Sequence, residues 1–263
     1  MATDMGTGMA TETIRKRRNK EFLMLHFSLK KRLSKTELLM GMTDVHAHLL
    51  PGVDDGIRTF GEAEEAVRYL ERLGVRRMVL TPHVMEDYAS NTAATLTEQF
   101  TDFCRRIPSS IRFTLAAEYM LDAAFQQRRS EPLLLLGKQR ILVETSYMAG
   151  PPDLLSILYD LSVSGLIPVI AHPERYLYLS DKEIEALKTQ GYELQMNLMS
   201  LAGIYGNGIR RRAELFLEKG WYTYVGSDLH RLSVYQHALQ KIELSRKQIR
   251  QIETLFTNNE KLF

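Results

Sequence analysis

Two histidines and three aspartates lie close together in the stretch MTDVHAHLLPGVDDG, residues 42–56. Asp44, His46 and His48 alternate with apolar residues, so on a β-strand these three side chains would share one face. Imidazole nitrogens and carboxylate oxygens are ligands of divalent metal ions. The stretch therefore predicts one part of a metal site, and a polar, solvent-facing strand that runs into a turn is the alternative.

Similar side chains recur at the ends of other expected strands. The chain has seven histidines, of which His26 lies in an N-terminal leader and His237 in the middle of an expected helix. The other five fall on or just after β-like runs, and three acidic residues take matching places. The eight residues are His46, His48, His83, His172, His230, Glu118, Glu144 and Asp228. If all gather at one end of a sheet, they predict a multinuclear metal site.

The elements that must position these residues alternate between β-like runs and amphipathic helical stretches from residue 43 onward. Strands are expected in TDVHAHL, RRMVLTPH, IRFTLAAEYM, RILVETSY, IPVIAHP, YELQMN and WYTYVGSDLH. The helical stretch between the first two begins with a Thr59–Glu62 capping box and ends at Gly74. This alternation favours a parallel α/β sheet, and about seven units in one run favour a closed or nearly closed barrel. Functional groups gather at the C-terminal ends of strands in such barrels.

Composition excludes several classes of protein. The 263 residues are 44% hydrophobic and 25% charged, which is typical of a soluble globular protein. The one cysteine, Cys104, excludes an internal disulfide and fits a reducing compartment. Residues 1–40 hold nine Lys and Arg against four Asp and Glu. Residues 41–263 therefore hold 25 Lys and Arg against 28 Asp and Glu. This slightly acidic part of the chain is not expected to bind nucleic acid.

We expect residues 1–41 to be a flexible basic leader and residues 42–263 to be one catalytic domain. The apolar run at residues 22–27 is too short for a signal peptide core or a transmembrane helix. The leader is expected to be a solvated tail, and a basic amphipathic anchor to a membrane surface stays open as the alternative. The expected location is the cytoplasm, either free or at the inner face of the membrane.

The motifs D-x-H-x-H, T-x-H, A-H-P-E-R-Y and G-S-D-x-H together resemble the PHP (polymerase and histidinol phosphatase) superfamily. Within it, HLLPGVDDG, AHPERY and GSDLH are most similar to the bacterial tyrosine-protein phosphatases of capsule and exopolysaccharide systems. The resemblance covers roughly residues 42–235. It implies a distorted (β/α)7, TIM-like barrel that holds three metals. We expect two to three divalent ions per chain, with manganese first and iron or zinc as alternatives.

The resemblance also implies a ligand set. His46 and His48 would bind a first metal with Asp228, and Glu118 would bridge two metals. A second metal would take Glu144 and His172, and a third would take His83, His230 and Asp55, which we favour over Asp54. The nucleophile in phosphoester hydrolysis would be a hydroxide that bridges two of the ions.

An arginine is expected to hold the phosphate. Arg175 lies three residues after His172, and its alternative role is a salt bridge with Glu174 or another acid. Arg231 is a second candidate for substrate binding. Cysteine-dependent chemistry is excluded, because Cys104 in CRRIPSS has Ser110 where a phosphate-binding arginine would have to be. We expect Cys104 to pack on a helix face.

The predicted function is metal-dependent hydrolysis of phosphotyrosine in proteins. The expected substrate is a membrane-associated bacterial tyrosine kinase of polysaccharide synthesis or export. The alternatives are a small-molecule phosphatase, such as one for histidinol phosphate, and a non-catalytic metal-binding module. No transmembrane segment is expected, and the sequence leaves the oligomeric state open.

Overall fold

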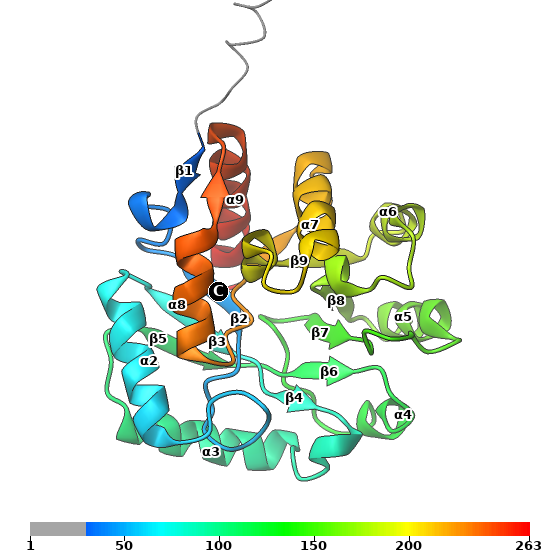
Figure 1. Cartoon of the computed structure of the whole chain (residues 1–263). Helices are drawn as coiled ribbons and strands as arrows, with labels where there is room; N and C mark the ends of the chain where they lie inside the picture. Colours follow the sequence, from blue (N-terminus) through cyan, green and yellow to red (C-terminus); the bar gives the residue numbers. More distant parts are fainter. Residues whose placement is uncertain (1–29) are drawn as a thin grey trace, which may run out of the picture.

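In the computed structural model, which describes residues 30–263, parallel strands curl around a common axis and helices lie outside them (Figure 1). One sheet has six strands in the order β10-β9-β8-β7-β6-β4, and another has three in the order β2-β3-β5. The strands are β2 (Thr43–Ala47), β3 (Arg77–Leu80), β4 (His83–Val84), β5 (Arg112–Leu115), β6 (Glu118–Met120), β7 (Arg140–Glu144), β8 (Ile167–Ala171), β9 (Glu193–Asn197) and β10 (Tyr224–Gly226).

The two sheets form one barrel, because two strands are each split by a short interruption. Two residues separate β3 from β4, and one of them is Pro82, which has no N–H for a sheet hydrogen bond. Two residues likewise separate β5 from β6. Backbone bonds from Asp228 to His46 (2.8 Å) and from His48 to Leu229 (2.9 Å) join the last strand to the first. The expected (β/α)7 barrel is confirmed, with these two interruptions as the feature that the sequence pattern does not show.

Apolar side chains fill the inside of the barrel below the C-terminal ends of the strands. A cluster of buried residues draws Val45, Val79, Leu142, Val169 and Tyr224 from five different strands. A larger buried cluster packs between the strands and the helices. On β7, the apolar Leu142 is followed two residues later by Glu144, so the same strand face changes from core to site.

Helices occupy most of the connections between strands. They are α2 (Phe60–Arg72), α3 (Ala93–Arg106), α4 (Phe125–Arg128), α5 (Leu154–Val163), α6 (Asp181–Thr189), α7 (Asn207–Lys219), α8 (Leu232–Lys241) and α9 (Arg246–Glu260). At the start of α2, Thr59 accepts the N–H of Glu62, but the Glu62 carboxylate accepts the N–H of Arg58 instead of completing the expected box. None of the helices in residues 30–263 is long and apolar enough to span a bilayer.

The folded part of the chain begins before the expected boundary at residue 42. Strand β1 (Lys31–Arg32) pairs antiparallel with β11 (Glu243–Leu244). Leu33 follows in the short helix η1 (Leu33–Lys35), is fully buried, and donates its N–H to Ile242 at 2.9 Å. Residues 30–41 therefore pack on the barrel and do not form part of a flexible leader, while the leader prediction for residues 1–29 lies outside the described residues.

Candidate metal centre

Glu118, at the start of β6, lies at the centre of the histidine cluster and is fully buried. Its Oε2 atom is 3.1 Å from Nε2 of His46, 3.3 Å from Nε2 of His48 and 3.3 Å from Nδ1 of His83. Its Oε1 atom is 2.9 Å from Nε2 of His172. One carboxylate thus contacts four imidazoles from three separate segments of the chain, as expected of a ligand shared between ions.

Three groups of side chains lie close enough together to bind a metal ion through one atom each. They are His48 with His83 and His230; His46 with Glu118, His172 and Asp228; and His83 with Glu118 and Glu144. All eight residues expected from the sequence are present in these groups. His83 and Glu118 begin the short strands β4 and β6, and the other six lie near or beyond the C-terminal ends of strands. Nε2 of His48 also lies 3.1 Å from Nε2 of His46 and 3.5 Å from Oδ1 of Asp228, so the structure brings together the three residues that the resemblance assigns to a first metal.

Several buried side-chain atoms of the cluster have no hydrogen-bond partner among the described residues. They include Nδ1 of His83, Oε1 of Glu144 and Oδ1 of Asp228. The first two atoms lie 2.8 Å apart without forming a hydrogen bond to each other. Buried polar atoms are otherwise nearly always satisfied, so these unpartnered atoms are typical of ligands directed at a shared ion. The donor set therefore fits divalent cations.

The electrostatics of the cluster also favour added positive charge. Burial alone would lower the pKa of His46, but the carboxylates of Glu118 and Asp228 outweigh it and raise that pKa to about 9. Burial and the charge of Glu118 together raise the pKa of Glu144. Metal ions and protons compete for such ligands, so divalent cations would replace the protons that the carboxylates hold on the imidazoles.

Hydrogen bonds from neighbouring side chains orient the expected ligands. Gln195 places its Oε1 atom 2.9 Å from Nδ1 of His46, and Asp54 places Oδ2 2.8 Å from Nδ1 of His48. Asn197 donates to Oδ2 of Asp228 at 2.7 Å, which leaves Oδ1 for a metal. Such contacts fix the orientation and tautomer of metal ligands. Sequence reasoning missed Gln195 and Asn197, although two polar residues at period two in a buried strand were a usable signal.

The two aspartates of GVDDG take different positions. Asp54 accepts the N–H of His83 at 3.1 Å in addition to its contact with His48, so it orients the cluster. Asp55 lies with Oδ1 3.4 Å from Nε2 of His83 and 3.3 Å from Nε2 of His230, and its side chain is 60% exposed. Hydrogen bonds with these two histidines lower the pKa of Asp55. This position is compatible with the expected choice of Asp55 as the ligand.

Asp44 does not join the cluster, although simple alternation places it on the face of His46 and His48. The pairing of β2 with β3 shifts register between Asp44 and Ala47, and such bulges redirect side chains. Asp44 instead accepts the backbone N–H groups of His46 (3.1 Å) and Ser227 (2.9 Å). It therefore fixes the backbone between the first and last strands.

Two of the expected ligands have strained backbones. Among the described residues, His172 (φ +33°) and Asp228 (φ +53°) are the non-glycine residues with positive φ. Each lies just after a strand, where the backbone turns and the side chain reaches the cluster. This conformation is unfavourable for residues with a Cβ atom and is concentrated at functional sites in proteins.

Arg175 ends the short helix η3 (Pro173–Arg175) and contacts the cluster directly. Its Nη1 atom donates to Oδ2 of Asp228 at 2.9 Å. Its guanidinium carbon lies 4.0 Å from the centre of the Tyr147 ring and 4.4 Å from that of Tyr205. The expected alternative, a salt bridge with Glu174 or another acid, is thus present with Asp228 as the acid. Glu174 does not take part, because its buried carboxylate accepts hydrogen bonds from other groups.

A cavity of about 280 Å³ lies over the cluster and is lined in part by Tyr147, Arg175, Tyr205 and Arg231. Tyr147 is 44% exposed, so the rim of this cavity is accessible. Neither tyrosine was expected at the site from sequence. Cys104 lies on α3 as expected, but it is exposed rather than packed, and burial of part of its thiol raises its pKa.

A parallel barrel whose strand ends carry a cluster of histidines and carboxylates around a shared glutamate is typical of metal-binding proteins. The chain matches the family model for capsular polysaccharide synthesis, CpsB/CapC, over residues 42–262. It therefore belongs to the CpsB/CapC family.

Curated relatives and solved structures agree with this assignment. Tyrosine-protein phosphatase YwqE of Bacillus subtilis is 30% identical, over 72% of this chain and 77% of that protein. Tyrosine-protein phosphatase CpsB of Streptococcus pneumoniae is 28% identical, over 73% of this chain and 84% of that protein. The crystal structures of YwqE and CpsB are described as those of unique metal-dependent tyrosine phosphatases. One chain from them aligns with this chain with a TM-score of 0.68 and 29% identity, over 75% of this chain and 84% of that one.

Proposed function

We propose that this chain is a metal-dependent phosphatase that hydrolyses phosphotyrosine in a protein. The observation that carries the proposal is the cluster around Glu118, with its unpartnered ligand atoms, beside an arginine that lines an accessible cavity. The relatives named as tyrosine-protein phosphatases support the substrate class. The metal dependence stated for YwqE and CpsB supports the cofactor.

The proposed cofactors are two to three divalent ions, with manganese favoured and iron or zinc as alternatives. Nitrogen and oxygen ligands without a thiolate suit all three metals. Bound ions would supply Lewis acidity and an activated water for attack on phosphorus. The proposed ligands are His46, His48, Asp55, His83, Glu118, Glu144, His172, Asp228 and His230.

Arg175 is the proposed phosphate-binding residue. One of its terminal nitrogens is held by Asp228, and the two tyrosine rings keep the planar group in place. The remaining N–H groups are available for phosphoryl oxygens, which a guanidinium binds in bidentate fashion. Arg231, which lines the same cavity, is the second candidate.

A protein substrate suits the cavity better than a small amino-alcohol phosphate. Tyr147 and Val234 at its rim are 44% and 43% exposed, so a peptide can approach from solvent. Phenolate is also a better leaving group than an alkoxide, so no dedicated general acid is required. We propose a membrane-associated tyrosine kinase of polysaccharide export as the substrate, which places the chain in the cytoplasm or at the inner face of the membrane.

A substrate comparison tests the proposal. kcat/KM is measured for a phosphotyrosyl peptide, a phosphoseryl peptide and histidinol phosphate with the same metal-loaded protein. We expect the phosphotyrosyl peptide to be preferred and His48→Ala to abolish its turnover. A preference for histidinol phosphate would identify a small-molecule phosphatase, and equally feeble rates on all three substrates would indicate a non-catalytic module.

A further inference from the structure

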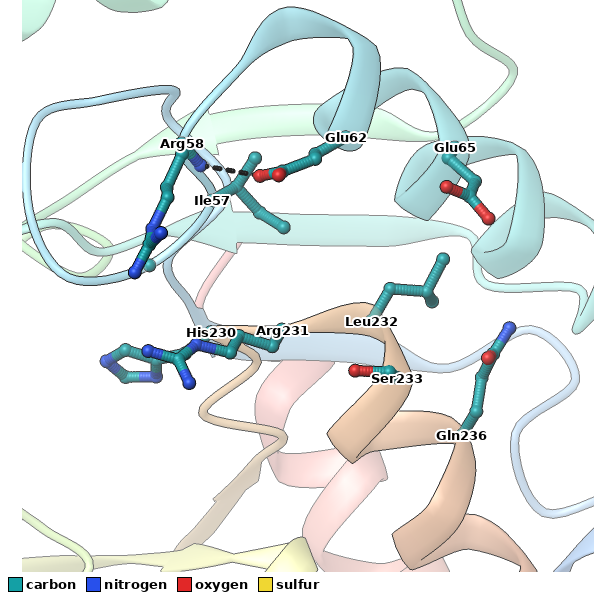
Figure 2. Close-up of a pocket in the computed structure, with 10 residues that line it drawn as sticks. Ile57, Arg58, Glu62, Glu65, His230, Arg231, Leu232, Ser233 and Gln236 are labelled. Carbon is teal, nitrogen blue, oxygen red and sulfur yellow. Dashed lines mark hydrogen bonds between the residues drawn. The ribbon is translucent and has the colours of Figure 1, made fainter.

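A second cavity, of about 420 Å³, adjoins the metal centre (Figure 2). It lies between the segment that leads into α2 and the start of α8. His230 lines both this cavity and the one over the cluster, so the two meet at a proposed metal ligand. The second cavity therefore lies where a peptide would continue beyond a phosphotyrosine held at the cluster.

Two arginines provide positive charge at the end of this cavity near His230. Figure 2 shows the guanidinium groups of Arg58 and Arg231 on the same side as the His230 ring. Both side chains are exposed, and in residues 30–263 no carboxylate oxygen lies within 4.0 Å of either guanidinium. Two unpaired cations in one cavity attract an anionic group and favour bidentate contacts with it.

The acidic residues of the cavity do not neutralise these arginines. The Glu62 carboxylate accepts the backbone N–H of Arg58 at 2.9 Å, so it stabilises the start of α2. Glu65 points into the cavity from the next turn of α2, away from the guanidinium groups in Figure 2. The cavity thus has a positive end near the metal centre and a negative end farther out.

We infer that this cavity binds an anionic side chain that flanks the phosphotyrosine in the substrate. This inference rests on the proposed function and specifies the sequence that the enzyme selects. Adjacent residues of an extended peptide are about 3.4 Å apart, so a group one or two residues from the phosphotyrosine can reach past His230. The anion is a carboxylate or a second phosphotyrosine, since both present the oxygens that guanidinium groups bind.

Peptide kinetics test the inference. Four phosphotyrosyl peptides differ only at the neighbouring positions, which carry Glu, Gln, a second phosphotyrosine or Tyr. We expect kcat/KM to be roughly two- to thirtyfold higher for Glu than for Gln, or for the second phosphotyrosine than for Tyr, the range given by two exposed ion pairs. These two comparisons distinguish the sources of the anion.

Variants of Arg58 connect this preference to the cavity. Arg58→Gln is expected to lower the preference at least twofold, and Arg58→Glu to abolish or invert it, with p-nitrophenyl phosphate turnover unchanged. Arg250→Gln, at an exposed arginine on α9, is the matched control and should change nothing. Calorimetry with non-hydrolysable phosphonate versions of the peptides should show the same order of affinity.

Equal rates on the charged and neutral peptides would overturn the inference and leave the proposed function intact. An equal loss on p-nitrophenyl phosphate and on every peptide in Arg58→Gln would also overturn it, because the arginine would then bind the scissile phosphate. If metal-loaded wild-type protein hydrolyses no phosphotyrosyl substrate, the proposed function fails, and the inference fails with it.

Discussion

Replacement of Arg175 by lysine separates phosphate binding from the integrity of the metal centre. Lysine keeps the positive charge beside Asp228 but loses the planar group between Tyr147 and Tyr205 and the paired N–H donors. A hydrogen bond to a charged group is worth about 1.5–3 kcal/mol. We therefore expect kcat/KM for a phosphotyrosyl peptide to fall roughly 10- to 150-fold.

Metal content should stay at the wild-type value in Arg175→Lys, since Asn197 still donates to Oδ2 of Asp228 at 2.7 Å. The matched control is Arg140→Lys. Arg140 likewise contacts a carboxylate, Glu193, and a tyrosine ring, but at the opposite end of the barrel strands. This control should retain full kcat/KM.

The assays are steady-state kinetics and elemental analysis of the same protein samples. An Arg175→Lys variant with wild-type kcat/KM would refute the role of Arg175 in phosphate binding. Loss of metal from this variant would show instead that the arginine acts through Asp228, by holding a ligand in place.

Three further predictions concern other parts of the chain. Cys104→Ser should keep wild-type turnover, because the thiol lies on the surface of α3, and a loss of activity with fold and metal retained would contradict the metal mechanism. Asp55→Ala should bind fewer ions by elemental analysis than wild type, and unchanged stoichiometry would remove Asp55 from the ligand set. Asn259→Ala should lower the free energy of unfolding in urea by about 2–4 kcal/mol, because the backbone carbonyls of Thr43 and Val225 and the N–H of Val225 would lose their hydrogen bonds to this side chain. A loss below about 1 kcal/mol would contradict this reasoning.

Much of the site follows from sequence because parallel strands end on the same side of a barrel. Once VLTPH, VIAHP and GSDLH are assigned to strand ends, the convergence of His83, His172 and His230 follows from topology. The division of these histidines among metal ions does not follow from topology, because it depends on differences of a few tenths of an ångström in their distances to Glu118.

The missed features depend on contacts between distant segments. Asp44 leaves the cluster because of a register shift against β3, and no local pattern in TDVHAHL encodes that shift. Arg175 forms the salt bridge that was expected as its alternative role, but the identity of the acid, Asp228, 53 residues away, was left open by the sequence. Tyr147 comes from the segment after β7, and its position over the arginine could not be derived from spacing.

The packing of Leu33, Leu38 and Leu39 on the barrel was also missed, for a related reason. The charges of Lys31 and Arg32 suggest a solvated tail, yet their backbone pairs with β11 while their side chains stay exposed. Leu33, directly after β1, is the one side chain in residues 30–41 that is fully buried. A short strand of this kind is determined by its partner near the C-terminus.

Reconstitution of metal-free protein tests the central claim most directly. The chain is stripped with a chelator, manganese is added stepwise, and bound metal and phosphotyrosyl peptide turnover are followed on the same sample. We predict no turnover without metal, followed by a rise that saturates at two to three bound ions per chain. Full turnover by the metal-free protein, or saturation with metal and no turnover, would contradict the account.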